Sequence, residues 1–270
     1  MKRRLFLALP LVGLVPFNLF AQTPNAIKFS KTPEEKGLAI AMETDRRDAG
    51  FGNYIADMTM ILRNRQGDKS IREVRMKILE VPGDGDKSMN IFDKPRDVKG
   101  TVVLTFSHGL KPDEQWIYLP ALKRVKRISS SNKSGPFMGS EFAYEDIGSW
   151  EVKKYTYRYL RDEVLNGNDC FVVENTPAYK YSGYSHQIEW VDKTIYQPRQ
   201  IVFYDRKGAL LKTLTFKGYR QYLGRYWRAD EMLMVNHQTG KSTRLLWKNY
   251  RFRTGLSSRD FTKNSMKRVR

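Results

Sequence analysis

Cysteine and histidine are scarce in this chain of 270 residues, which contains one Cys and three His. A single thiol excludes a disulfide framework, a cysteine-based zinc site and a haem attachment motif. His108, His186 and His237 lie far apart and lack metal-ligand spacing, so we expect each to be an ordinary hydrogen-bonded side chain. The composition therefore predicts a protein with neither a metal nor a cofactor.

Motifs for covalent and nucleotide chemistry are also missing. The sequence contains no G-x-S-x-G elbow, no P-loop and no G-x-G-x-x-G. Ser129, Ser130 and Ser131 follow one another without a neighbouring base. On a strand, His186 and Glu189 would point to opposite faces. We therefore expect no enzymatic activity, because a lipid hydrolase of the cell envelope would need a nucleophile and a base that this sequence does not supply.

Long apolar runs are absent except near the N-terminus. Basic residues 2–4 precede an apolar stretch from Leu5 to Phe20, and the small residue Ala21 follows. This order is typical of a cleaved secretory signal, and two prolines in the stretch disfavour the alternative of an uncleaved membrane anchor. We predict a signal peptide over residues 1–21, a single domain over residues 22–270 and a periplasmic location. General secretory and twin-arginine export both stay open.

Acidic residues are too few to balance the basic ones. The chain carries 48 Lys and Arg against 29 Asp and Glu, a formal net charge of +19. Removal of residues 1–21 would leave 45 basic and 29 acidic residues, a net charge of +16. For an exported protein we expect no nucleic acid partner but anionic lipid headgroups, lipopolysaccharide phosphates or an acidic protein. Solubility alone is the other explanation.

Residues 32–50 have the pattern of a capped helix. Thr32 can cap the helix, Pro33 suits its first turn, Glu35 completes a capping box, and the helix should end near Gly50. Its packed face is expected to contain Leu38, Ala41 and Met42.

Beyond this helix the hydrophobic period changes to two, which predicts strands. The expected strands cover residues 56–62, 74–78, 101–106, 115–119, 124–128, 154–165, 170–174, 187–192, 199–204, 211–219, 231–236 and 243–252. Because no helices intervene, we predict a mainly β fold with a strongly curved antiparallel sheet. A strand-free segment from Ser129 to Trp150 and a short helix after Ser257 complete the prediction.

Methionines and aromatic residues alternate along the predicted strands. Met58, Met60 and Met76 lie on neighbouring strand faces, and Trp116 and Tyr118 share one face of another strand. Met is flexible and suits a surface that accepts variable apolar partners. Two interpretations stay open: these side chains fill a core, or they line a cavity of a curved sheet. One helix and a short tail are little cover for so large a sheet, which supports a cavity.

The segment of residues 115–150 carries a family resemblance. It contains Trp116-Ile117-Tyr118-Leu119-Pro120, the basic strand Arg124-Val125-Lys126-Arg127-Ile128, and Phe137-Met138-Gly139-Ser140-Glu141-Phe142 followed by Tyr144-Glu145-Asp146. This string resembles the outer membrane lipoprotein-sorting proteins, which are LolA/LolB-like and related to the periplasmic carrier LolA. The resemblance extends from Pro33 to the C-terminus.

The resemblance implies an unclosed β-barrel, with the N-terminal helix and a helical or loop lid at its mouth. Such a LolA-like fold shelters acyl chains during transfer across the periplasm. Members of this branch are thought to work beside inner-membrane transporters of the resistance-nodulation-division (RND) type, so such a transporter is an implied partner. This chain is longer than the archetypal carrier, and the specificity of that carrier for lipoproteins does not transfer to it.

Three groups of residues are expected to function in such a carrier. Acyl chains would contact Met58, Met60, Met76, Trp116, Tyr118, Phe137, Met138 and Phe142. Anionic headgroups or a membrane partner would contact Lys123, Arg124, Lys126 and Arg127. The loop would move as a lid, or fold over the sheet edge, at Gly135, Pro136 and Gly139. The loop carboxylates Glu141, Glu145 and Asp146 are expected at the surface.

The sequence therefore predicts a non-enzymatic periplasmic carrier. It would bind the acyl chains of a lipid or lipoprotein in an apolar cavity and move them between the inner and outer membranes, with transient contact with the membrane surface. The alternative is an accessory docking module for an RND-type transporter, in which the interior of the sheet is only a core.

Overall fold

The computed structural model describes residues 32–109 and 111–269, so the predicted signal peptide lies outside the described residues. Helix α1 (Pro33–Asp48) begins as the capping pattern indicates. The Thr32 hydroxyl accepts a hydrogen bond from the Glu35 N–H, and the Glu35 carboxylate accepts one from the Thr32 N–H. This reciprocal pair satisfies two of the N–H groups that the start of a helix leaves free.

The packed face of α1 differs from the prediction. Gly37 and Ile40 are buried, and Ala41 is partly buried. Leu38 and Met42 keep 42% and 57% of their surface exposed, so their predicted burial is wrong. The helix packs against the sheet through Gly37, which has no side chain, so Leu38 and Met42 face the solvent.

Gly37→Ala is expected to destabilise the protein by about 1–3 kcal/mol, because overpacking costs more than the helix propensity of Ala returns. A Cβ at this position would lie 2.8 Å from the backbone nitrogen of Tyr159 in strand β7 (Tyr155–Leu165). Equilibrium urea unfolding measures the change. Leu38→Ala is the control on the same helix and should cost under about 0.5 kcal/mol. Equal losses in both variants would contradict the close approach of α1 to β7.

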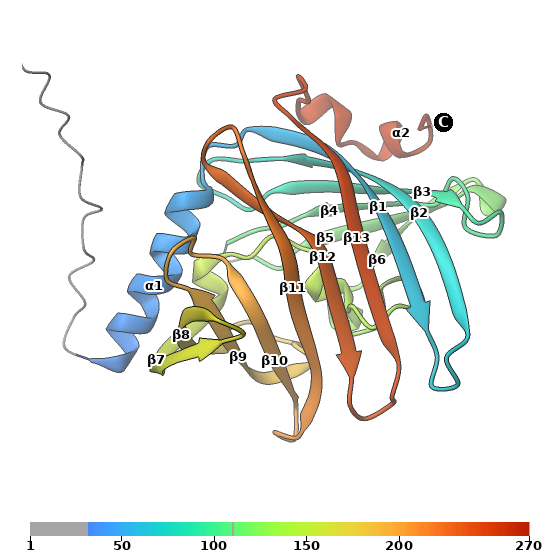
Figure 1. The fold of residues 1–270 in the computed structure, drawn as a ribbon. Coiled ribbons are helices and arrows are strands. Elements are labelled where there is room, and N and C mark those ends of the chain that lie inside the picture. The colour runs from blue at the N-terminus through green and yellow to red at the C-terminus, as the bar shows by residue number, and fades with distance from the viewer. Residues whose placement is uncertain (1–31, 110, 270) are drawn as a thin grey trace, which may run out of the picture.

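A single antiparallel sheet contains every strand in the described residues. Its thirteen strands are β1 (Asn53–Arg63), β2 (Lys69–Leu79), β3 (Lys87–Lys94), β4 (Val102–Phe106), β5 (Glu114–Leu119), β6 (Arg124–Ile128), β7 (Tyr155–Leu165), β8 (Asn168–Pro177), β9 (Tyr184–Asp192), β10 (Pro198–Asp205), β11 (Leu210–Tyr222), β12 (Tyr226–Asn236) and β13 (Ser242–Phe252). Consecutive strands pair throughout except between β6 and β7, and β1 also pairs with β13. That pairing joins two meanders into one curved sheet (Figure 1).

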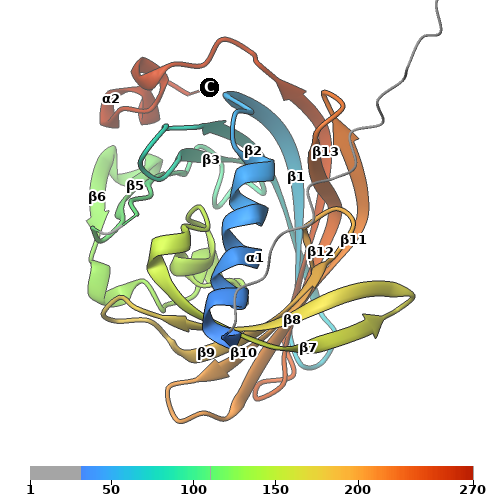
Figure 2. The same ribbon diagram turned by 90° about the vertical axis from the view of Figure 1, so that its left-hand side faces the viewer.

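The sheet forms an unclosed barrel, as predicted. Its two edges are β6 and β7, which do not pair with each other. The chain between these edges, residues 129–154, lies inside the curve of the sheet, and α1 crosses the opening (Figure 2). In this connection the backbone forms the short 3-10 helices η2 (Ser130–Asn132), η3 (Phe137–Gly139), η4 (Tyr144–Asp146) and η5 (Val152–Lys154).

Strand β3 was not predicted from the sequence, and both of its faces are covered in the structure. Every residue from Ser88 to Phe92 is buried. Phe92 packs in the core inside the barrel, whereas Met89 and Ile91 pack in a second cluster on the outside. The polar residues Ser88 and Asn90 alternate with Met89 and Ile91, but Phe92 breaks the alternation, so the period of two covers only four residues.

The C-terminal segment covers the outer face of β3, β4 and β5. After β13 it forms η6 (Ser258–Asp260) and the short helix α2 (Lys263–Met266), as predicted for this region (Figure 1). Phe261 and Met266 are buried in the outer cluster with Met89 and Ile91. This segment therefore provides the second layer that makes β3 a two-sided core strand.

Candidate functional site

A cavity of ≈ 1380 Å³ lies inside the unclosed barrel, between the sheet, α1 and the loop of residues 129–154. Pockets for drug-sized ligands measure about 300–1000 Å³, so this cavity is large. Five of the eight predicted cargo contacts line it, namely Met58, Met60, Met76, Phe137 and Phe142. Met60 is fully buried in the core beside the loop, whereas Met76 keeps accessible surface. Met60 therefore belongs to a core, whereas Met76 lines the cavity with accessible surface.

Trp116 and Tyr118 do not line the cavity, and the structure corrects their predicted place. Both belong to the outer cluster, under Phe261 and Met266 of the C-terminal segment. The alternate residue Gln115 points inward, where its amide nitrogen lies 3.0 Å from the carbonyl oxygen of loop residue 144. Sequence alternation separates the two faces of β5 but cannot tell which face is the inner one.

Met138 also lies outside the cavity lining, although its neighbours Phe137 and Phe142 are part of it. Its backbone has a φ of 50°, and its carbonyl oxygen accepts a hydrogen bond from the Arg72 guanidinium. The Met138 side chain packs against the core cluster inside the barrel. Met138 therefore helps to hold the loop against the sheet and does not face the cavity.

The loop of residues 129–154 turns back on itself inside the barrel at the three predicted positions. Pro136 pairs with Ala143 in an isolated bridge, and the carbonyl oxygen of Gly135 accepts a hydrogen bond from the N–H of Tyr144 at 3.1 Å. Gly139 has a φ of +76°, in the left-handed region that favours glycine. The loop thus fills part of the interior, and its movement as a lid stays a prediction.

Buried polar contacts hold the loop to the sheet. Asp146 accepts hydrogen bonds from the Lys212 ammonium and the Tyr184 hydroxyl, each at 2.8 Å. Lys212 also donates to the carbonyl oxygen of Glu141 at 2.9 Å. The side chains of Lys212 and Asp146 are only 4% and 9% exposed. The expectation of a surface position for Asp146 is therefore wrong.

Glu145 and Glu141 are further anchors of the loop. Glu145 accepts hydrogen bonds from the hydroxyls of Ser182 at 2.8 Å and Tyr179 at 2.9 Å. Burial raises the pKa of Glu145, and the charge of Asp146 raises it further. Glu141 accepts a hydrogen bond from the Asn236 amide at 2.7 Å. Because their partners are distant in the sequence, the sequence alone offered no sign of these contacts.

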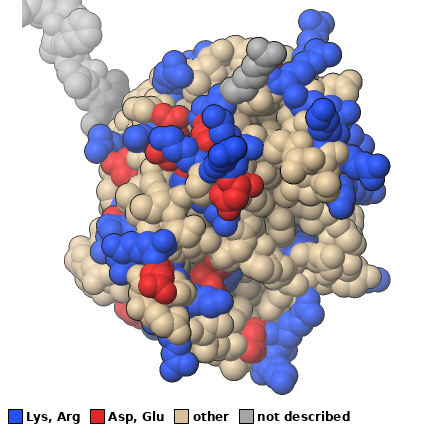
Figure 3. Space-filling view, turned by 90° about the vertical axis from the view of Figure 1, so that its right-hand side faces the viewer, with Lys and Arg blue, Asp and Glu red and all other residues tan. Residues whose placement is uncertain are grey.

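The predicted docking residues lie together on and beside the edge strand β6. Lys123, Arg124, Lys126 and Arg127 are all exposed, and Arg127 lies 3.4 Å from Glu114. Charged side chains on an edge strand also discourage pairing with other chains. On the face in Figure 3, Lys and Arg side chains extend along much of the margin, and Asp and Glu side chains lie among them in several places. The structure therefore presents these four cations to solvent.

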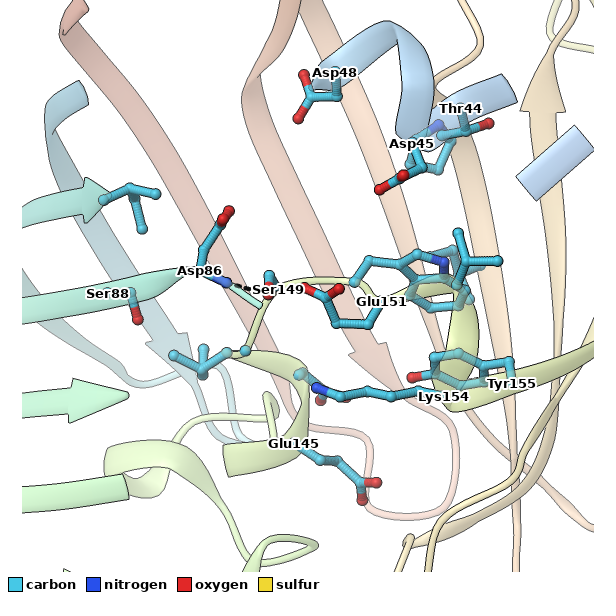
Figure 4. Close-up of a pocket in the computed structure, with 18 of the residues that line it drawn as sticks. Thr44, Asp45, Asp48, Asp86, Ser88, Glu145, Ser149, Glu151, Lys154 and Tyr155 are labelled. Carbon is cyan, nitrogen blue, oxygen red and sulfur yellow. Dashed lines mark hydrogen bonds between the residues drawn. The ribbon is translucent and has the colours of Figure 1, made fainter. Parts of the chain in front are cut away.

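Carboxylates gather at the opening of the cavity, in contrast to the basic exterior. Asp45 and Asp48 at the end of α1 lie around the same space as Asp86 and Glu151 (Figure 4). Burial raises the pKa of Asp86 to about 7, and the charges of Glu151 and Asp48 act in the same direction. Burial also raises the pKa values of Glu151 and Asp45. The opening is thus acidic, and Asp86, Glu151 and Asp45 hold their protons more tightly than free carboxylates do.

Glu189 is a further carboxyl group inside the barrel, on β9. It accepts a hydrogen bond from the Asn175 amide at 2.7 Å and lines the cavity. Burial raises the pKa of Glu189 to about 7. Sequence reasoning considered Glu189 only as a partner for His186, and the two side chains do point apart, since His186 stacks on Tyr204 outside the cavity lining.

Glu189→Gln is expected to stabilise the protein by up to about 3 kcal/mol near pH 8 and to leave it unchanged near pH 4. The folded chain keeps a proton that the unfolded chain releases near its ordinary pKa of 4.5. Stability is therefore lost as the pH rises from about 4.5 to about 7. Urea unfolding at both pH values measures the difference. A difference that does not vary with pH would contradict the raised pKa of Glu189.

The histidines make ordinary hydrogen bonds, as expected. His108 lies 2.7 Å from Asp84, His186 lies 3.1 Å from Ser185, and His237 contacts a threonine hydroxyl at 2.8 Å. Within residues 32–109 and 111–269, no group of three or more His, Cys, Asp or Glu could hold a metal ion. No helix in the same residues has the length and apolar character needed to cross a membrane.

Comparisons with known proteins identify relatives of this fold and cavity. A family model described as an uncharacterized protein matches residues 84–268. An outer membrane lipoprotein-sorting protein domain from Vibrio parahaemolyticus is 60% identical, with a TM-score of 0.85 over 87% of this chain and 99% of that one. A DUF1329 family protein from Desulfovibrio piger is 30% identical, with a TM-score of 0.83 over 87% and 100% of the two chains.

A LolA superfamily protein from Nitrosomonas europaea shares the fold, with 19% identity and a TM-score of 0.69 over 87% of this chain and 100% of that one. No curated protein matches the sequence. The match of 60% identity along almost all of the Vibrio domain shows that this chain belongs to the outer membrane lipoprotein-sorting family, with the fold of the LolA superfamily.

Proposed function

We propose that this protein is a periplasmic carrier. It shelters the acyl chains of a lipid or lipoprotein as they move between the inner and outer membranes, and it does not change them chemically. The observation that carries this proposal is the ≈ 1380 Å³ cavity, lined by Met58, Met76, Phe137 and Phe142, in a chain of the lipoprotein-sorting family.

The energetics of lipid transfer explain why such a cavity is useful. Burial of one CH₂ group gains about 0.8 kcal/mol, so a palmitoyl chain prefers an apolar site to water by roughly 12 kcal/mol as an upper bound. A carrier must offset most of that cost and still release its cargo. The flexible thioether of Met76, which keeps accessible surface in the cavity, can adapt to chains in different positions.

The exposed cations on and beside β6 support contact between the carrier and membranes. Lys123, Arg124, Lys126 and Arg127 lie on the outside of the barrel, where they can meet anionic headgroups. The same four residues also fit the alternative function, a non-enzymatic docking module for an RND-type transporter. In that case the charges would contact the transporter and the cavity would stay without lipid.

Native mass spectrometry of the mature protein from its own periplasm, combined with solvent extraction, tests the carrier. We expect a bound lipid or acylated peptide that extraction releases and identifies. The control is the same protein after delipidation and incubation with vesicles of the inner-membrane lipids. A protein that is free of lipid in both preparations would contradict the carrier and favour the docking module.

A further inference from the structure

Unpartnered polar groups gather in the cavity. In the described part of the chain, five buried side-chain nitrogen or oxygen atoms have no hydrogen-bond partner, and they belong to Ser88, Asn90, Asn175, Gln187 and Trp247. All five residues line the cavity. Buried polar groups in proteins are almost always hydrogen-bonded, so each such group needs an explanation. A cargo made only of hydrocarbon would not satisfy them.

Two of these residues adjoin Glu189 and form one polar site with it. Asn175 on β8 lies directly opposite Gln187 on β9, and the Asn175 amide donates to Glu189 at 2.7 Å. Asn175 and Gln187 are 0% and 2% exposed. The unpartnered atoms of Asn175 and Gln187 are their amide oxygens, which accept hydrogen bonds. Asn175, Gln187 and Glu189 together form the inner polar site.

Strand β9 is inverted compared with an ordinary amphipathic strand. Gln187 and Glu189 line the cavity, whereas Ile188 and Trp190 belong to a cluster with Cys170 that lies outside the cavity lining. A strand whose only task was to cover a lipid cavity would place its apolar residues inward. The inner polar site therefore runs against the requirements of a plain acyl-chain site.

The surroundings of Glu189 favour a positive charge. Among the described residues Glu189 forms no ion pair, and its neighbours in the sheet register are Val173 and Ile201. Burial raises the pKa of Tyr157 and of Tyr219, and the Glu189 charge raises both further, although for Tyr219 the nearby Arg199 has a larger, opposite effect. A carboxylate beside aromatic rings, without a cation of its own, is a suitable environment for an ammonium group.

The charge of the whole cavity lining also favours a cationic ligand. Ten of its lining residues are acidic and six are basic, although the protein is strongly basic. The two cations with little exposure are already paired, Lys154 with Asp113 at 2.8 Å and Arg228 with Asp48 at 2.6 Å. A cavity lined by an excess of acidic groups attracts cations and repels anionic ligands.

We propose that the cavity binds a lipid that carries a protonated amine, and that this amine sits against Asn175, Gln187 and Glu189. This inference rests on the proposed carrier function and names the chemical class of its cargo. The ammonium group donates hydrogen bonds to the two amide oxygens and to the carboxylate, and the methionine-lined remainder of the cavity holds the chain. A hydroxyl group has one hydrogen to donate, so it would satisfy only one of the two amide oxygens and would leave the carboxylate without a counter-charge. A carboxylate or phosphate group would be repelled.

Three amphiphiles with the same chain test the proposal on the delipidated mature protein. Hexadecylamine, hexadecanol and hexadecanoate compete, each below the concentration at which it aggregates, with a neutral pyrenyl alkane whose fluorescence reports displacement. We expect the amine to bind at least about tenfold more tightly than the alcohol, because its hydrogen bonds are charge-assisted, and the carboxylate to bind most weakly.

Variants of the inner polar site separate charge from shape. Glu189→Gln should remove most of the preference for the amine and leave the affinity for the alcohol within about twofold, because only the counter-charge is lost. Gln187→Leu should weaken both the amine and the alcohol. The matched control is Glu174→Gln, on the same strand as Asn175 but outside the cavity lining, which should change neither affinity.

The outcomes distinguish this inference from the proposed function. Equal binding of all three amphiphiles, unchanged by Glu189→Gln, would mean that the inner polar site binds only water; the amine cargo would be rejected and the carrier retained. Binding of the alcohol as tight as that of the amine would also overturn the amine. If none of the amphiphiles displaced the probe, the carrier function itself would fail.

Discussion

Met76→Asp is expected to weaken the binding of a neutral amphiphile such as hexadecanol by at least about 100-fold, because its alkyl chain would remove water from an unpaired carboxylate. Met76 lies on β2, opposite Ala56 of β1, and keeps surface that is accessible from the cavity. In the free protein the new carboxylate stays hydrated through this surface, so the fold is retained. Displacement of the pyrenyl alkane measures the loss.

Met42→Asp is the matched control, because it makes the same chemical change outside the cavity. Met42 lies on α1 with 57% of its surface exposed and does not line the cavity. Its substitution should leave the affinity for hexadecanol within about twofold. Unchanged binding in a folded Met76→Asp variant would show that the acyl chain does not use this cavity.

Asp146→Ala is expected to lower the free energy of unfolding by about 3–5 kcal/mol, because it leaves a buried ammonium group without its counter-ion. The Asp146 carboxylate accepts hydrogen bonds from Lys212 and Tyr184 at 2.8 Å each, and from the backbone of Ala143 at 2.7 Å. This is a large part of the about 5–15 kcal/mol that stabilises a typical domain. Urea unfolding followed by tryptophan fluorescence measures the loss.

Two comparisons show whether the effect comes from the buried charge. Glu73→Ala breaks the exposed pair with Lys94, at 3.0 Å, and should cost under about 1 kcal/mol. Lys212→Met combined with Asp146→Ala should recover part of the stability, because neither charge is then left unpaired. If Asp146→Ala cost no more than Glu73→Ala, the loop would not depend on this pair for its place in the barrel.

The strands were predictable wherever one face of the sheet is polar. Residues 56–62 and 74–78 alternate clearly, and they lie within β1 and β2 as observed. The capping pattern at Thr32 placed the start of α1 correctly, because a cap is a local interaction. Strand β3 was missed because its alternation extends only from Ser88 to Ile91. The loop and the C-terminal segment that cover its two faces are distant from it in the sequence.

The candidate site was only partly predictable, for the same reason. Met58, Met60 and Met76 were placed on the inner face correctly, but Trp116 and Tyr118 lie on the outer face under the C-terminal segment. The inner polar site was not predicted at all. The alternation of Gln187, Ile188, Glu189 and Trp190 resembles an ordinary half-exposed strand, whose polar residues would face the solvent.

The sequence by itself determined most of the helices and strands of this protein, because caps, turns and a period of two act between neighbours in the chain. Only the tertiary structure decided which face of each strand lines the cavity. A strand has two equivalent faces, and the choice depends on where α1, the loop of residues 129–154 and the C-terminal segment pack. That choice placed Glu189 inside the barrel and Trp116 outside, and with them the chemistry of the cavity.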